Sequence, residues 1–209
     1  MLIPYKLIYN FILDRCITLS IDESHAVKHS MDVLKYTQKI YNEELLLFPE
    51  LKKQKKIMYT SAMLHDMCDS KYMDVDKGLN DIKEFIETIN YDKKEIDIIL
   101  KIIGTMSYSK VKKNGFPDLK EYQKSYHIVR EADLLCGYDV ERCIVFGMIG
   151  KNMDYDESVI ATKELYNIRM AKQIEDNLFT TQFGLKEAKK LDKENKIRLE
   201  EINDLIINN

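Results

Sequence analysis

Apolar residues recur at helical spacing along nearly the whole chain, and this pattern limits the fold more than any other feature. Within residues 25–44, for example, Val27, Met31 and Leu34 fall on one face of a helix. The chain of 209 residues contains only seven glycines and three prolines, whereas all-β folds need more turn residues. The sequence therefore predicts an all-α fold, a bundle of helices.

The same periodicity gives the expected positions of the helices. They are predicted over residues 25–44, 55–66, 77–89, 92–106, 122–136, 139–149, 157–178 and 181–206. Asp22 or Ser24 is predicted to cap the first of them. Residues 67–76 and 107–119 are predicted to be loops, the second because it contains several turn residues. The last helix repeats apolar residues, and we expect it to pack back on the domain rather than against a partner chain.

Charge and hydropathy exclude several classes of protein. The net charge is −3, which argues against non-specific binding to nucleic acid, since such binding relies on a basic face. No apolar stretch is long enough to span a membrane, and the N-terminus lacks the features of a signal peptide. A cytoplasmic protein without a membrane partner is the resulting expectation. The cysteines lack CxxC spacing and are expected to be reduced, in or near the core: Cys16, Cys68, Cys136 and Cys143.

The residues best suited to metal binding or catalysis are histidines and aspartates in apolar surroundings. His25 and His29 lie four apart on one predicted helix, so they share a face. His65 and Asp66 end the next apolar segment, and Asp133 lies in a largely apolar stretch where an unpaired carboxylate is costly. Any one of them alone is more often structural. Together, nitrogen and carboxylate ligands from separate helices meet the requirement of a divalent metal site.

The order of these residues and their sequence frames add a family resemblance. His29 occurs in SHAVKHSMDV, His65-Asp66 in AMLHDMCDSKYMD and Asp133 in IVREADLLCGYDV. With these frames the chain resembles the HD-domain metal-dependent phosphohydrolases, whose signature is H…HD…D. The resemblance implies an HD-type helical bundle that forms a single domain over residues 1–209. Its core would cover about residues 20–150, with a C-terminal helical extension over about 157–206.

The resemblance also implies a chemistry. His29, His65, Asp66 and Asp133 would bind one divalent metal ion, with Mn²⁺ or Fe²⁺ favoured and Mg²⁺, Co²⁺, Ni²⁺ or Zn²⁺ as alternatives. A water bound to such a metal becomes a hydroxide nucleophile near neutral pH, and the metal polarises a phosphoryl oxygen. The expected reaction is hydrolysis of a phosphate ester or anhydride of a small molecule, with a nucleotide as the preferred candidate.

Further residues are expected to assist Asp66 in catalysis. Asp69 would orient the water or relay a proton, unless it only caps a turn. Lys71 would hold a substrate phosphate or neutralise developing charge, unless it is merely solvated. His25 would support the ligands or touch the phosphate, whereas His127 is expected to be structural. Three lysines are expected to be solvated rather than to form a phosphate-attracting rim: Lys110, Lys112 and Lys113.

Two positions depart from the pattern of the family. Asp32 stands where many relatives carry an arginine, and Met106 where they often carry a histidine. An acid at the first position removes a phosphate contact and adds like-charge repulsion. A methionine is a poor ligand for a hard ion, which argues against a second metal. Two other classes therefore stay open: a catalytically decayed metal-binding module with a regulatory or partner-binding role, and an all-helical adaptor. The sequence also leaves open a homo-oligomer.

Overall fold

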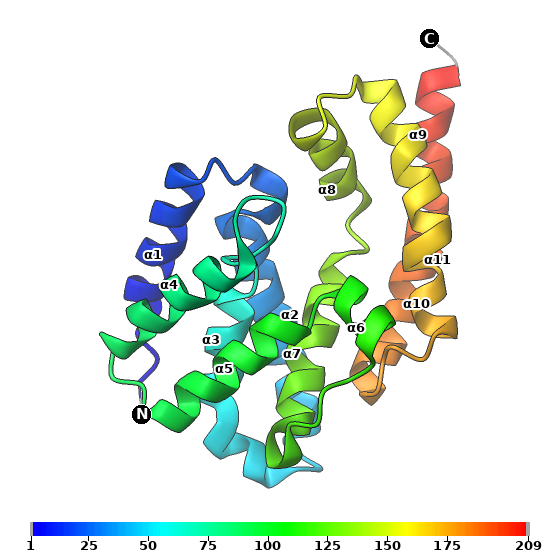
Figure 1. Cartoon of the computed structure of the whole chain (residues 1–209). Helices are drawn as coiled ribbons and strands as arrows, with labels where there is room; N and C mark the ends of the chain where they lie inside the picture. Colours follow the sequence, from blue (N-terminus) through cyan, green and yellow to red (C-terminus); the bar gives the residue numbers. More distant parts are fainter. Residues whose placement is uncertain (1, 208–209) are drawn as a thin grey trace.

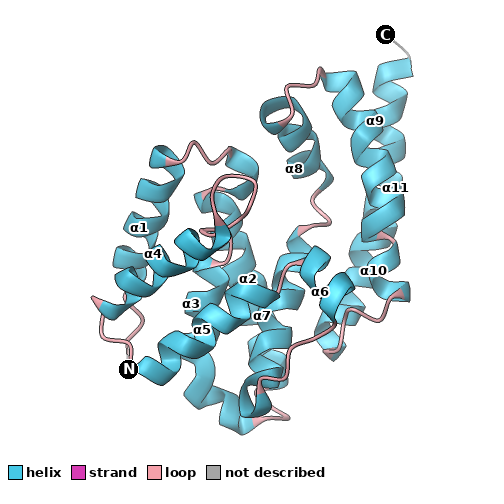
Figure 2. Ribbon diagram, viewed as in Figure 1, coloured by secondary structure: helices cyan, strands magenta, loops and turns pink. Residues whose placement is uncertain are grey.

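The computed structural model describes residues 2–207, and every regular element in this range is a helix (Figures 1 and 2). This confirms the predicted all-α fold. The α-helices are α1 (Tyr5–Thr18), α2 (Val27–Glu44), α3 (Lys55–Leu64), α4 (Val75–Glu87), α5 (Lys93–Thr105), α6 (Tyr108–Asn114), α7 (Gln123–Cys136), α8 (Val140–Val145), α9 (Tyr155–Leu165), α10 (Lys172–Glu175) and α11 (Gln182–Ile207). Among these described helices, none is both long and apolar enough to cross a bilayer.

Short helical turns connect several of these elements. Three are 3₁₀-helices: η1 (Glu23–His25), η2 (Pro49–Gln54) and η3 (Lys120–Tyr122). Two are π-helical: η4 (Phe146–Gly150), which continues α8, and η5 (Tyr166–Met170), which continues α9. Such π-segments interrupt the regular hydrogen bonding of a helix and often occur at functional sites.

Helices α2, α3 and α7 form the centre of the bundle. Helix α2 packs against both α3 and α7, and α3 also packs against α5 and α7 (Figure 1). One stripe of α2 is buried and contains His29, Val33, Thr37 and Ile40. Because residues at this spacing share a face, the stripe that packs on α3 and α7 also carries His29 inward. The packing of this stripe therefore directs the side chain of His29, a candidate metal ligand, toward the interior.

Three predictions of local structure need correction. The predicted loop over 107–119 is wrong in its first half, because α6 forms there and buries Val111, while Lys110 Nζ donates to the carbonyl oxygen of Gly104 at 2.7 Å. The pattern did not predict α1, which buries only a narrow stripe of three residues. The predicted caps of α2 are also wrong: its first turn follows Ala26 without a side-chain cap.

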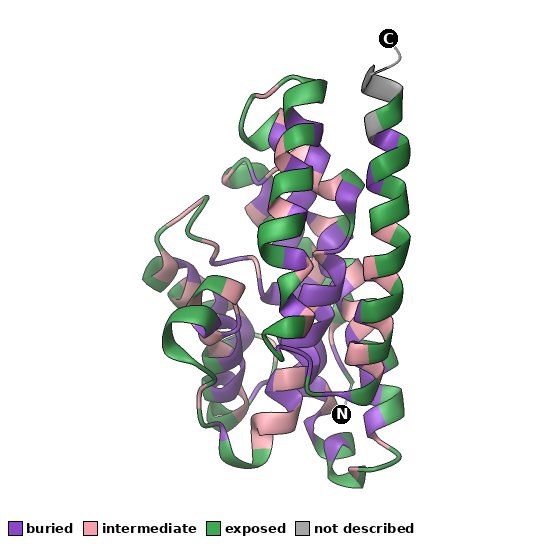
Figure 3. Cartoon of the chain, turned by 90° about the vertical axis from the view of Figure 1, so that its right-hand side faces the viewer, coloured by how far each residue is buried: buried purple, intermediate pink, exposed green. Residues whose placement is uncertain are grey.

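The long C-terminal helix packs back on the rest of the chain, as predicted. Helix α11 contacts α7, α9, α10 and α2, and it buries Ala188, Leu199 and Ile202. Its opposite face is exposed over most of its length (Figure 3). The apolar repeat seen in the sequence is therefore the face that docks this helix.

A buried carboxylate holds the start of α11 against α7. Glu131 Oε1 accepts hydrogen bonds from the backbone N–H of Thr180 at 2.7 Å and from its hydroxyl at 2.8 Å. Glu131 Oε2 accepts from the Thr181 hydroxyl at 2.6 Å. Arg130 lies beside the same carboxylate, with its Nη2 at 3.5 Å from Oε1. A Cβ on Gly184 would overlap Oε2, so glycine allows this close approach.

His127 serves packing in α7, and its titration provides a test of that environment. The ring packs edge-on against Phe116, and its Nε2 lies 3.1 Å from Gln123 Nε2. Burial lowers the pKa of His127 to about 4, and the charges of Arg130 and Lys124 act in the same direction. We expect its C2 proton to titrate with a midpoint near pH 4 in an NMR pH series.

The lowered pKa of His127 makes the folded protein less stable as the pH falls. The unfolded chain takes up the His127 proton at about pH 6.5, whereas the folded chain resists it down to about pH 4. Between these values the unfolded state binds more protons, so His127 makes the free energy of unfolding fall as the pH falls. A midpoint near 6.5 would contradict the packing described here.

Candidate metal centre and its pocket

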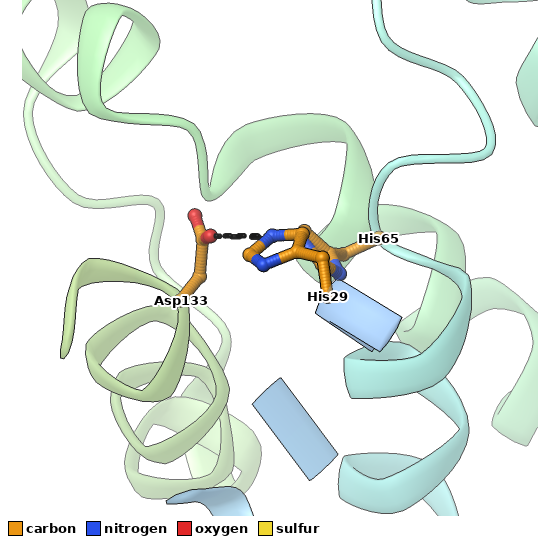
Figure 4. A group of neighbouring side chains, drawn as sticks. All are labelled: His29, His65 and Asp133. Atoms are coloured by element: carbon orange, nitrogen blue, oxygen red, sulfur yellow. Dashed lines mark hydrogen bonds and ion pairs between the residues drawn. The ribbon is translucent and has the colours of Figure 1, made fainter. Parts of the chain in front are cut away.

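Three side chains from separate elements meet at one point (Figure 4). His29 comes from α2, His65 from the turn after α3 and Asp133 from α7. The two histidine Nε2 atoms lie 3.1 Å apart, and Asp133 Oδ1 lies 3.5 Å from each of them. Both histidines are buried, whereas the Asp133 side chain is 25% exposed, so the group is accessible from the side of this carboxylate.

Asp66 completes the group from the residue next to His65. Helix α3 stops at Leu64, two residues earlier than predicted, and the chain continues in tight turns. His65 keeps helical backbone angles, and the two carboxylate oxygens of Asp66 reach back to the two histidines. Asp66 Oδ2 lies 3.3 Å from His29 Nε2, and its Oδ1 lies 3.2 Å from His65 Nε2. The structure thus brings together all four residues predicted as metal ligands.

The geometry of these atoms fits a bound cation. Metal–ligand bonds of about 2.0–2.2 Å at tetrahedral or octahedral angles separate neighbouring ligand atoms by roughly 3.0–3.5 Å. Asp66 Oδ2 is buried and has no hydrogen-bond donor, although an orphaned carboxylate oxygen is costly. His65 Nδ1 donates to the Ala62 carbonyl oxygen at 2.9 Å, so in the neutral ring that binds a metal the lone pair is on Nε2, which faces the group. The group of His29, His65 and Asp133 could therefore hold a metal ion.

The titration behaviour of the group follows from burial and mutual charge. Burial lowers the pKa of His29. Burial acts the same way on His65, but the carboxylates of Asp66 and Asp133 outweigh it and raise the His65 pKa well above its usual range. Burial alone would raise the pKa of both aspartates, yet the histidines hold each pKa below its usual range. Two charged carboxylates thus share the centre, which is the environment that a divalent cation stabilises.

The group opens onto a pocket of about 510 Å³. His29, Asp66 and Asp133 line this pocket, whereas His65 does not and approaches the group from the buried side. The other predicted site residues line it as well: His25, Asp69 and Lys71. Every predicted site residue except His65 is therefore accessible from one cavity.

Asp69 and Lys71 interact with each other at the wall of the pocket. Asp69 Oδ1 accepts from the backbone N–H of Lys71 at 2.9 Å, and Asp69 Oδ2 lies 3.5 Å from Lys71 Nζ. Asp69 thus stabilises the turn and faces the pocket, so the two roles considered for it are compatible. Lys71 Nζ also lies 5.1 Å from the centre of the Phe146 ring.

Part of the pocket comes from residues that the sequence did not single out. Three cations line it from the second half of the chain: Arg142, Lys151 and Arg169. Tyr108 and Phe146 also line it, and the Arg169 guanidinium lies 4.6 Å from the centre of the Tyr108 ring. Charged residues on helices usually belong to solvated faces, so only the tertiary structure could distinguish these.

The two positions that depart from the family pattern lie outside the pocket lining. Asp32 forms an ion pair with Lys28, whose Nζ is 2.5 Å from Asp32 Oδ2, and Met106 is part of the buried core. None of the three lysines expected to be solvated lines the pocket, and Lys112 pairs with Asp176 at 2.7 Å. Arg142, which does line the pocket, donates from its Nη1 to the Ser24 carbonyl oxygen at 2.8 Å.

Comparison with known proteins supports the fold but identifies neither a family nor a function. The structure is similar to the crystal structure of a structural-genomics target from Lactobacillus plantarum, with a TM-score of 0.71. The two sequences are 15% identical, and the match covers 98% of this chain and 97% of the other. At this identity the similarity demonstrates a shared fold only. No family model and no curated protein matches the chain.

Addition of Mn²⁺ to metal-stripped protein is expected to raise its unfolding temperature. A cation that binds only the folded state at about 100 times its Kd adds about 2.7 kcal/mol. For a chain of this size, that energy corresponds to a rise of about 5–10 °C in differential scanning calorimetry. Asp133→Asn removes one ligand charge and should abolish most of the rise. An equal rise in wild type and variant would place the metal elsewhere.

Proposed function

We propose that the protein is a metal-dependent phosphohydrolase of the HD type. The observation that supports this best is the group of His29, His65, Asp66 and Asp133 at the wall of a pocket with a cationic lining. A metal bound by these side chains would supply an activated water and a Lewis acid for a phosphoryl oxygen. The order of the four residues along the chain, H…HD…D, agrees with the resemblance described above.

The remaining residues of the pocket have roles that follow from their positions. Asp69 is a carboxylate at the pocket wall, three residues after a ligand, and it accepts a proton from or orients the attacking water. Lys71 and Arg142 offer donors to phosphate oxygens, and they compensate negative charge that develops during bond cleavage.

The shape and chemistry of the pocket favour a nucleotide as substrate. Beyond the metal group the lining includes the cations Lys151 and Arg169 and the aromatic rings of Tyr108 and Phe146. Aromatic rings and an arginine guanidinium are the groups on which planar bases stack. Cations interspersed with them suit a substrate that carries phosphate beside a planar moiety.

A panel of nucleoside mono-, di- and triphosphates tests the proposal. Metal-stripped protein is supplied with Mn²⁺, and release of phosphate and of pyrophosphate is followed separately. We expect turnover of at least one nucleotide that depends on added metal and is absent from the Asp133→Asn variant. Stoichiometric metal binding without turnover across the panel would contradict hydrolysis and favour the metal-binding regulatory module. Absence of metal binding would contradict both functions.

A further inference from the structure

A chain of hydrogen bonds links Lys71 to Asp22, a residue that the sequence suggested only as a helix cap. Lys71 Nζ lies 2.8 Å from His25 Nε2. On the other side of the ring, His25 Nδ1 lies 2.6 Å from Ser24 Oγ and 3.1 Å from the Tyr72 hydroxyl. Both hydroxyl groups donate to the carboxylate of Asp22. The chain therefore joins the segment before α2 to the turn that follows Asp66.

The chemistry of the two ends fixes the direction of every bond. A lysine ammonium has only donors, so His25 Nε2 must accept, and the proton of the neutral ring lies on Nδ1. A carboxylate has only acceptors, so Ser24 and Tyr72 must donate to Asp22. Their oxygens are then the acceptors for the Nδ1–H of His25. The network is satisfied only with this tautomer of the histidine.

Hydrogen bonds also keep the acceptor end of the network charged. Burial would raise the pKa of Asp22, but the hydrogen bonds from Ser24 and Tyr72 outweigh it and the pKa is lowered. Asp22 therefore presents a charged carboxylate to both hydroxyl groups.

The network is also packed on the side of the pocket. The Phe146 ring lies edge-on to His25, with centroids 5.4 Å apart. At Gly150 a Cβ would lie 2.6 Å from the Phe146 ring and 3.3 Å from Asp22 Oδ2, so the neighbouring backbone leaves little space for these side chains to move. The lysine at the end of this chain is half-exposed and faces the pocket.

We propose that Asp22 and Tyr72 are positioning residues that orient His25 so that it fixes Lys71 as a phosphate-binding cation at the pocket wall. The inference rests on the proposed function, because Lys71 lines the same pocket as the metal-binding group. A free lysine loses rotamer freedom when it binds a phosphate, and that loss weakens binding. A lysine already held by His25 loses less, so the hydrogen-bond network strengthens the binding of a phosphorylated substrate.

The test uses calorimetry to measure the affinity of the Mg²⁺-loaded full chain for inorganic pyrophosphate, a measurement of binding rather than of turnover. We expect Lys71→Met to weaken pyrophosphate binding about 10-fold or more and Tyr72→Phe to weaken it about 3- to 10-fold. If Tyr72 acts through Lys71, the double variant binds no more weakly than Lys71→Met alone. Tyr91→Phe is the matched control, because it removes a buried hydroxyl bond to Thr60 outside the pocket lining.

The outcomes separate this inference from the proposed function. Unchanged affinity in Tyr72→Phe, or additive effects in the double variant, would overturn the positioning role while the hydrolase proposal stands. A wild type that binds Mg²⁺ but not pyrophosphate would overturn the proposed function and the phosphate role with it. Independently, ¹⁵N NMR of the histidines must show His25 protonated on Nδ1, since a proton on Nε2 excludes the Lys71 contact. Equal unfolding temperatures of Tyr72→Phe and wild type ensure that affinity changes do not reflect misfolding.

Discussion

Asp66→Ala is expected to remove bound metal and catalytic turnover together. Asp66 contacts both histidines of the group, and its Oδ2 is buried without a hydrogen-bond donor. Since even indirect partners of metal ligands change affinity 10- to 100-fold, loss of a ligand should lower metal affinity by at least about 100-fold. Turnover should fall below detection, because the activated water requires the metal. Metal content by mass spectrometry and nucleotide hydrolysis measure the two effects on the same sample.

A neighbouring acid provides the control for this experiment. Asp32 lies three residues after His29 on α2, but it pairs with Lys28 and does not line the metal pocket. Asp32→Asn should retain metal at the wild-type level. Full metal occupancy in Asp66→Ala would show that Asp66 is not a ligand, and the proposed centre would then consist of His29, His65 and Asp133 alone.

Glu131→Gln is expected to cause the largest loss of stability. The buried carboxylate accepts several hydrogen bonds from Thr180 and Thr181 and lies beside the buried guanidinium of Arg130. An amide NH₂ in place of one oxygen turns a donor toward other donors and leaves the arginine without its counter-charge. Disrupting a buried charge pair costs about 3–5 kcal/mol, so we expect a loss of about 3 kcal/mol in the free energy of unfolding.

Urea denaturation of the two proteins measures this loss, and hydrogen exchange shows where it acts. The bonds of Glu131 hold the residues just before α11, so amides of α11 should exchange faster in the variant. Glu164→Gln makes the same chemical change at an exposed position and should leave stability within about 0.5 kcal/mol of wild type. A Glu131→Gln protein as stable as this control would show that α11 is held by its apolar face alone.

The sequence alone was sufficient for the bounds of two long helices, although the predicted apolar face of one of them, α2, is not its buried face, since Met31 is 53% exposed. The predicted helices over 25–44 and 92–106 match α2 and α5 to within two residues at each end. Prediction failed where local signals were weak or misleading. Helix α1 buries only Ile8, Ile12 and Cys16 on an otherwise mixed surface. Helix α6 forms in a segment rich in turn residues because Val111 is buried in the core.

The sequence by itself suggested His29, His65, Asp66 and Asp133 as candidates for one site, because their order and frames resemble the H…HD…D signature and a buried carboxylate such as Asp133 is costly without a partner. Only the tertiary structure decided how they meet, because distances of 3.1–3.5 Å between side chains from α2, the turn after α3 and α7 depend on how these helices pack. The tertiary structure also decided which residues from the second half of the chain line the pocket. Arg142, Lys151 and Arg169 resemble any solvated cation in the sequence, and helix packing alone brings them to the same pocket as His29, Asp66 and Asp133.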